Sequence, residues 1–236
     1  MLSALGWGAL AAVSLVVGAL LAFVRAWRDR QIGLVLAFGA GALISAVSFE
    51  LAEEGVKVGG LGWTALGLGL GAMTYFMLDG LIERRFAGGN AAGDGGVGLA
   101  LGAFLDGLPE QAVLGIGLAS GAGVGVSLLV AIFVSNVPEA IGSARDMRRA
   151  GTSRNRILLL WAGVATCCAL ATVLGYAVAD AATGEPRSLI DGFAAGALIV
   201  MLIDSMIPEA TRGAGRVAGL ATTLGFAVAT ALSTMS

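Results

Sequence analysis

The chain has 236 residues, of which 57% are hydrophobic and only 13% are charged, and its mean hydropathy is +0.90. A soluble domain carries about 25% charged residues, so this composition excludes a soluble globular protein and indicates one whose solvent is lipid. The net charge of −2 does not indicate a class of partner, and no basic stretch resembles a nucleic-acid-binding patch. There is no histidine, so the commonest zinc ligand and the usual proton switch near neutral pH are both missing.

Eight apolar runs are long enough to cross a bilayer, since about 20 helical residues at ~1.5 Å each span a hydrocarbon core of ~30 Å. They predict transmembrane helices over residues 3–24, 32–52, 60–82, 96–118, 123–144, 157–179, 189–209 and 215–235. A Gly/Ala-rich segment, 86–97, is predicted to be a flexible linker between the third and fourth helices. The whole chain, 1–236, is therefore predicted to be one all-α integral membrane domain.

The basic residues predict the orientation of these helices. The first, third, fifth and seventh loops hold 12 of the 14 Lys and Arg residues, and only Lys57 and Arg187 fall on the other side. By the positive-inside rule the Arg-rich loops are cytoplasmic and both chain ends are outside. No Lys or Arg precedes the first apolar run, so we expect that run to be an inserted helix and not a cleaved signal peptide.

Two internal similarities predict an inverted repeat. Residues 38–44 of the second helix and 193–199 of the seventh both carry Phe followed three residues later by Gly-Ala-Leu-Ile, although the two helices run in opposite directions. Between them, FLDGLPE at 104–110 and FVSNVPE at 133–139 share Phe, Pro and Glu at matching places. Inverted repeats with interrupted helices are typical of secondary transporters, whose substrate site lies where the repeats meet.

Polar side chains interrupt the fourth and fifth predicted helices. Asp106 and Glu110 are four residues apart, and Asn136 and Glu139 are three apart, so each pair lies on one helix face. A charge near the bilayer centre costs at least ~2.5–3.5 kcal/mol, which indicates a functional reason for it. Three carboxylates in one patch repel one another unless a cation or protons neutralise them. The sequence thus predicts a divalent metal site with four ligands, namely Asp106, Glu110, Asn136 and Glu139.

Each of these glutamates directly follows a proline, Pro109 or Pro138. A proline inside a helix cannot donate its backbone hydrogen bond and frees the carbonyl four residues earlier, here that of Leu105 or Val134. Both helices are therefore expected to kink and to offer backbone oxygen near the depth of the carboxylates. Two other interpretations stay open: structural kinks whose acids are protonated, and a proton relay.

These two proline motifs resemble those of the ZIP (Zrt/Irt-like) family of divalent metal transporters. In that family the fourth helix carries His-Asn-x-Pro-Glu-Gly and the fifth carries His-x-x-Pro-Glu; this chain has DGLPEQ at 106–111 and SNVPEA at 135–140. The resemblance covers the whole chain and includes GFAAGALIVMLIDSMIPEA at 192–210. It implies eight helices in a 3+2+3 arrangement, with Glu110, Asn136 and Glu139 as metal ligands.

The chain also departs from the family pattern. Asp106 and Ser135 stand where the family has histidines, Gly107 replaces an asparagine, and Cys168 lies near the place of a missing glutamate. Oxygen ligands favour hard cations such as manganese over zinc, unless a thiolate also faces the site. Additional candidates for the metal site or its pathway are Gln111, Ser135, Cys168 and Asp204.

The sequence as a whole predicts a transporter and not an enzyme, with no cofactor and a divalent metal such as zinc, manganese or iron as substrate. The expected partners are the metal ion and the lipid bilayer of the plasma membrane, here a bacterial inner membrane. The resemblance further implies alternating access with an elevator-like movement, transport toward the cytoplasm, and a homodimer. The alternatives are a metal sensor or scaffold that does not transport, and a transporter of a non-metal cation.

Overall fold

The computed structural model describes residues 1–86, 97–119 and 126–235, so the predicted linker lies almost wholly outside the described residues. The described residues are nearly all helical, and no β-strand occurs among them. In chain order the elements are α1 (Leu2–Val24), α2 (Asp29–Ala46), the π-helix η1 (Val47–Ala52), α3 (Glu53–Gly59), α4 (Leu61–Phe86), α5 (Val97–Ala119), α6 (Val126–Arg149), α7 (Arg154–Asp180), α8 (Glu185–Met201), the π-helix η2 (Leu202–Met206), α9 (Ile207–Ala214) and α10 (Val217–Met235).

Seven helical stretches in the described part of the chain are long and apolar enough to cross a bilayer. Two of them are composite: α2, η1 and α3 are continuous over Asp29–Gly59, and α8, η2 and α9 are continuous over Glu185–Ala214. The chain is therefore an all-helical, multi-pass membrane protein.

The second and seventh helices extend beyond the apolar runs from which they are predicted, which end near residues 52 and 209. Beyond the apolar run both helices keep helical backbone geometry, as far as Gly59 and Ala214. What ends each helix is the glycine that follows, Gly60 with φ 90° and Gly215 with φ 61°. A positive φ is a conformation that glycine adopts readily and that stops a helix.

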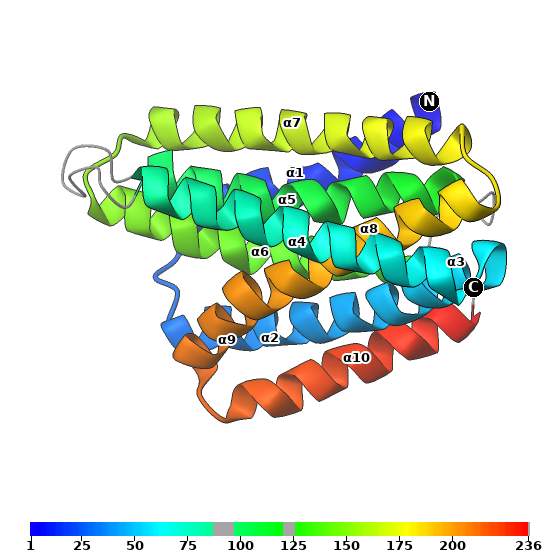
Figure 1. Ribbon diagram of the computed structural model, residues 1–236. Helices are drawn as coiled ribbons and strands as arrows, with labels where there is room; N and C mark the ends of the chain where they lie inside the picture. The colour runs from blue at the N-terminus through cyan, green and yellow to red at the C-terminus, as the bar shows by residue number, and fades with distance from the viewer. Residues whose placement is uncertain (87–96, 120–125, 236) are drawn as a thin grey trace.

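The helices pack in two groups, which we call group A and group B. Group A consists of α1, α5, α6 and α7. Group B consists of α2, α4, α8 and α10, with the extensions η1, α3, η2 and α9. In Figure 1, α7, α1 and α5 lie toward the top and α2 and α10 at the bottom. The two groups meet along a seam where α2 faces α6 and α8 faces α5.

Glycines bring helix backbones into contact inside each group. In group B, a Cβ atom at Gly41 of α2 would overlap the backbone carbonyl of Thr222 of α10. In group A, a Cβ atom at Gly115 of α5 would overlap the carbonyl of Thr172 of α7. In lipid, where burying apolar surface gives no driving force, such close approach supplies the van der Waals contact that holds helices together. The helix pairs α2–α10 and α5–α7 are therefore tightly packed.

Across the seam, where α2 packs against α6, the glycine contacts are less close. The closest of them among the described residues is that of Gly39 of α2, where a Cβ atom would lie 3.0 Å from the Cα of Ser135 of α6. Figure 1 shows the two chain ends at the same end of the bundle, with the α1–α2, α6–α7 and α9–α10 connections at the opposite end. The fourth-helix and fifth-helix motifs, on α5 and α6, thus lie in group A where it faces group B.

Candidate cation site

The predicted site residues lie on two helices of group A that contact each other, α5 and α6. Pro109 and Pro138 lie inside these helices, which continue past them. Glu110 is 1% exposed and Glu139 is 8% exposed, while Asp106 is half-buried. The spacing along each helix therefore does bring carboxylates into the interior of the bundle, as the sequence predicts.

Glu110 receives its hydrogen bond from the neighbouring helix. The hydroxyl of Ser135 on α6 lies 3.2 Å from both carboxylate oxygens of Glu110 and 3.0 Å from the carbonyl of Ile132. A serine has one hydroxyl proton, so it donates to one of these acceptors at a time. Ser135 thus stands between Glu110 and Gly39 of the opposite group.

Asn136 and Glu139 each keep a buried oxygen without a partner. The amide nitrogen of Asn136 donates to the hydroxyl of Ser14 on α1 at 3.0 Å, and Ser14 donates to the carbonyl of Ala11. No hydrogen-bond partner among the described residues reaches Asn136 Oδ1 or Glu139 Oε1. Because more than nine in ten buried polar groups in proteins are paired, these two oxygens are candidates for binding a cation.

Asp106 is held differently, by group B. Tyr75 of α4 donates its hydroxyl to Asp106 Oδ1 at 2.6 Å, and Ser205 of η2 donates to Oδ2 at 2.5 Å. Both oxygens of this carboxylate are therefore hydrogen-bonded across the seam. Asp106 links the two groups in this conformation, whereas Glu110 is bonded within group A.

The carboxylates of Asp106, Glu110 and Glu139 lie within electrostatic range of one another, and Glu209 of α9 is in range of Asp106 and Glu139. No Lys or Arg in the described ranges forms an ion pair with Asp106, Glu110 or Glu139. A buried charge without a counter-ion costs several kcal/mol in proteins. The cluster is therefore chemically suited to a cation or to protons.

Among the additional candidates, Cys168 is placed near the cluster. It is buried on α7, and a Cβ atom at Gly107 would lie only 2.9 Å from its sulfur. The thiol is in electrostatic range of Glu110 and Glu139. The Cys168 sulfur therefore lies where a side chain at position 107 would extend, and glycine leaves that space free.

The other two additional candidates are not brought to the carboxylates. Gln111 is buried and accepts a hydrogen bond from Thr172 of α7 at 2.8 Å, so its side chain faces that helix. Asp204 is exposed on η2, although its neighbour Ser205 bonds to Asp106. Asp204 thus lies beside the seam and outside the cluster.

The residues do not form a preassembled metal centre. In the part of the chain that the structure describes, no group of three or more His, Cys, Asp and Glu side chains is placed so that it could hold a metal ion. The set considered for a cation consists of Glu110 and Glu139 with the side-chain oxygens of Ser135 and Asn136. Closing this set around an ion requires the carboxylates to draw together.

A polar cavity of about 260 Å³ lies near the cluster, where α2, α6 and α9 meet. Its walls include Asp29, Arg145 and Glu209, and Arg145 donates to Asp29 at 2.5 Å. Because Glu209 is also in range of Asp106 and Glu139, it connects this cavity electrostatically with the carboxylates. The cavity lies at the end of the bundle that carries the α1–α2 connection (Figure 1).

Sequence reasoning missed the partners that hold the cluster. Tyr75 and Ser205 lie on helices far from Asp106 in sequence, and no spacing signal links them to it. Glu209 carries a weak signal, because the offset that aligns 38–44 with 193–199 also pairs it with Glu54. Only the structure reveals these contacts, because it places side chains of α4 and η2 next to Asp106.

Comparisons with known proteins do not assign the chain. No family model matches it, and no curated protein matches it significantly.

Proposed function

We propose that the chain transports a divalent metal cation across the plasma membrane by alternating access, through a site formed by Glu110 and Glu139 with Asn136 and Asp106. The observation that carries this proposal is the set of buried carboxylates on α5 and α6 with no basic side chain paired to them in the described part of the chain. Each such charge costs at least ~2.5–3.5 kcal/mol in a membrane, and a divalent cation offsets two of them at once.

The position of the cluster supports alternating access. The carboxylates lie in group A where it meets group B, and Asp106 is bonded to two residues of group B. The closest glycine contacts lie inside each group, whereas the polar cavity lies on the seam between them. A shift of the two groups relative to each other at this boundary would expose the site to one side at a time.

One end of the seam is closed by Arg187 at the start of α8. Its guanidinium donates to the Ile116 carbonyl of α5 at 2.9 Å and to the Asp191 carboxylate at 2.9 Å, and it lies 3.5 Å from the Ala179 carbonyl of α7. Ile116 is in the last turn of α5, where carbonyls lack partners within the helix, so a cation there is favourable. We infer a closed outer end and an inner end that opens through the polar cavity.

A structural correspondence between the two halves supports an inverted repeat. An offset of 155 residues relates Val47 to Leu202, where the two π-helices begin, and Gly60 to Gly215, the two glycines that end α3 and α9. Each π-helix therefore interrupts its span at an equivalent depth. We propose a 3+2+3 arrangement of eight spans, with α5 as the eighth span, both chain ends outside, and the homodimer that the ZIP resemblance implies.

Transport is tested with the full chain reconstituted in liposomes, by measuring Mn²⁺ uptake with an indicator inside the vesicles. Glu110→Gln and Glu139→Gln keep the side-chain shape but remove the charge, so each should reduce uptake to the protein-free level. Glu185→Gln is the matched control, because Glu185 is exposed at the start of α8. Site variants that fold and transport Mn²⁺ at the wild-type rate would contradict the proposal.

The same vesicles separate the alternatives. Mn²⁺ binding to the purified chain without uptake would favour a sensor or scaffold, and uptake of an organic cation that excludes metals would favour a non-metal transporter. Competition by Zn²⁺ tests the ligand set: oxygen ligands alone favour Mn²⁺, whereas a participating Cys168 thiolate favours Zn²⁺. Zinc preference that disappears in Cys168→Ser would show that the sulfur next to Gly107 sets selectivity.

A further inference from the structure

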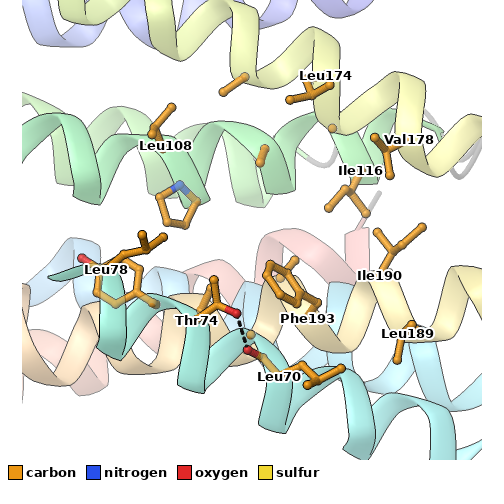
Figure 2. Close-up of a pocket in the computed structure, with 18 of the residues that line it drawn as sticks. Leu70, Thr74, Leu78, Leu108, Ile116, Leu174, Val178, Leu189, Ile190 and Phe193 are labelled. Atoms are coloured by element: carbon orange, nitrogen blue, oxygen red, sulfur yellow. Dashed lines mark hydrogen bonds between the residues drawn. The ribbon is translucent and has the colours of Figure 1, made fainter. Parts of the chain in front are cut away.

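A second, larger cavity lies in the seam, and its lining includes Tyr75, the residue that bonds to Asp106. It has a volume of about 490 Å³ and is lined by 19 residues of α4, α5, α7 and α8. Figure 2 shows Leu108 and Leu174 on one wall and Leu70 and Phe193 on the opposite wall. One wall thus belongs to group A and the other to group B.

The walls of this cavity are apolar. Only two of the lining side chains carry a polar atom, those of Thr74 and Tyr75. Thr74 donates to the carbonyl of Leu70 in its own helix at 2.7 Å, a bond drawn in Figure 2, and Tyr75 donates to Asp106 at 2.6 Å. Water in the cavity would therefore find no unpaired donor on these walls, and apolar cavities of this kind stay dry or bind apolar molecules.

The size and shape of the cavity fit a hydrocarbon chain. Its volume is roughly three times the ~150 Å³ of an engineered apolar cavity that binds benzene. On α5 the lining residues extend from Leu105 to Ile116, which corresponds to about 16 Å at the ~1.5 Å rise of a helix. That length is close to half of the ~30 Å hydrocarbon core, the depth of one leaflet.

The cavity opens toward the lipid. Its rim includes Leu70 and Leu174, which are 49% and 65% exposed, while its floor includes Ala194 and Ala197, which are 6% and 8% exposed. In a membrane protein an exposed apolar rim faces hydrocarbon. An empty cavity would leave the floor without contact on one side and forfeit its dispersion energy.

We propose that this cavity binds one acyl chain of a membrane lipid, inserted between group A and group B. The chain contacts both walls at once, from Leu174 on α7 to Phe193 on α8. Its occupancy is therefore linked to the separation of the two groups, because a state in which the walls approach each other has no room for it. This inference depends on the membrane location of the protein and is independent of transport.

The test uses the full chain reconstituted in phosphatidylcholine vesicles whose acyl chains carry a photoactivatable diazirine. After irradiation, mass spectrometry of peptides maps the cross-linked residues. Adducts are expected on the buried floor, at Ala194 and Ala197 of α8, as well as on exposed side chains. Adducts confined to exposed side chains, with none on the floor, would overturn the proposal.

Cavity-filling variants provide the matched comparison. Ala112→Leu and Ala171→Leu add volume inside the cavity and should each abolish the floor adducts while the adducts elsewhere remain. Ala162→Leu is the control, since Ala162 is exposed on α7 but does not line the cavity, and it should leave the pattern unchanged. Two filling variants guard against one that fails to fold, which size-exclusion chromatography would reveal. Floor adducts that persist in a folded filling variant would show that the label enters by another route.

Discussion

Asp106 and the two glutamates belong to one motif pattern, yet their surroundings differ. Both oxygens of Asp106 accept hydrogen bonds from group B, through Tyr75 and Ser205. Glu110 is bonded only within group A, and Glu139 keeps an oxygen without a partner among the described residues. We infer that Glu110 and Glu139 are the primary ligands, and that Asp106 becomes available to a cation only when its bonds across the seam break.

The sequence predicted these carboxylates because charge in an apolar helix is conspicuous. It could not predict Tyr75 and Ser205, since a hydroxyl in a membrane helix more often bonds to its own backbone, as Thr74 does here. Cys168 was only partly predictable. A weak alignment of the sequence put it near the site, and in the structure its sulfur lies next to Gly107.

A prediction at the scale of single residues concerns Arg187, which with Lys57 is one of the two basic residues outside the Arg-rich loops. Arg187→Ala leaves Asp191 buried without its partner, and removing one member of a buried pair costs about 3–5 kcal/mol. It also removes the bond between α8 and the Ile116 carbonyl. We expect a markedly lower thermal midpoint in detergent, and greater reactivity of a cysteine introduced at Ala179 toward an impermeant thiol reagent in vesicles.

The matched control for Arg187 is Lys57→Ala. Lys57 is exposed and pairs with Glu53 one turn away in the same helix, so it bridges no helices and should leave both measurements unchanged. The double variant Arg187→Ala, Asp191→Ala removes both charges and should recover part of the lost stability. Equal effects of Arg187→Ala and Lys57→Ala would show that Arg187 does not hold the seam.

At the scale of helices, apolar runs predicted the positions of the spans but not their ends or their internal geometry. Hydropathy cannot distinguish a helix that stops at the membrane surface from one that continues, as α3 and α9 do. The π-helices η1 and η2 carry no compositional signal, because widening one turn changes no residue type. The two glycines that end α3 and α9 are recognisable only once their positive φ angles are known.

The contrast between packing within a group and packing across the seam gives a second prediction. Gly41→Ala would drive a Cβ atom into the carbonyl of Thr222, a rigid backbone contact inside group B. Gly39→Ala would place a Cβ atom 3.0 Å from Ser135 Cα across the seam, where a shift of a few tenths of an ångström relieves it. We expect Gly41→Ala to lower the yield of folded protein and its thermal midpoint strongly, and Gly39→Ala to lower them much less.

The two glycine variants compare helix positions only two residues apart in α2, so helix propensity and membrane depth are nearly matched. Gly39→Ala should also reduce Mn²⁺ uptake, because it tightens the contact between α2 and Ser135 next to Glu110. If both variants lose the same stability, the seam is packed as rigidly as the groups, and movement between two rigid bodies loses its structural support.

At the scale of the whole molecule, the distribution of charge and the number of apolar helices both bear on the membrane topology. The α1–α2, α6–α7 and α9–α10 connections lie at one end of the bundle and the two chain ends lie at the other, as Figure 1 shows. An even number of crossings is needed for both ends to share a face, which agrees with eight spans when α5 is included. The distribution of Lys and Arg, 12 against 2, is the basis for the proposal that the chain ends face outside.

The orientation is tested with single cysteines in a background where Cys167 and Cys168 are replaced by serine. Positions Lys57 and Glu185 are exposed at the end proposed to be outside, and positions Arg28 and Ser153 are exposed at the Arg-rich end. In intact cells, cysteines at 57 and 185 should react with an impermeant thiol reagent, and those at 28 and 153 should react only after the membrane is permeabilised. The reason is that translocating an Arg-rich loop is opposed in proportion to its positive charge, and the loops near 28 and 153 carry most of it. Labelling of 28 and 153 in intact cells, with 57 and 185 protected, would reverse the orientation and with it the assignment of Arg187 to the outer end of the seam.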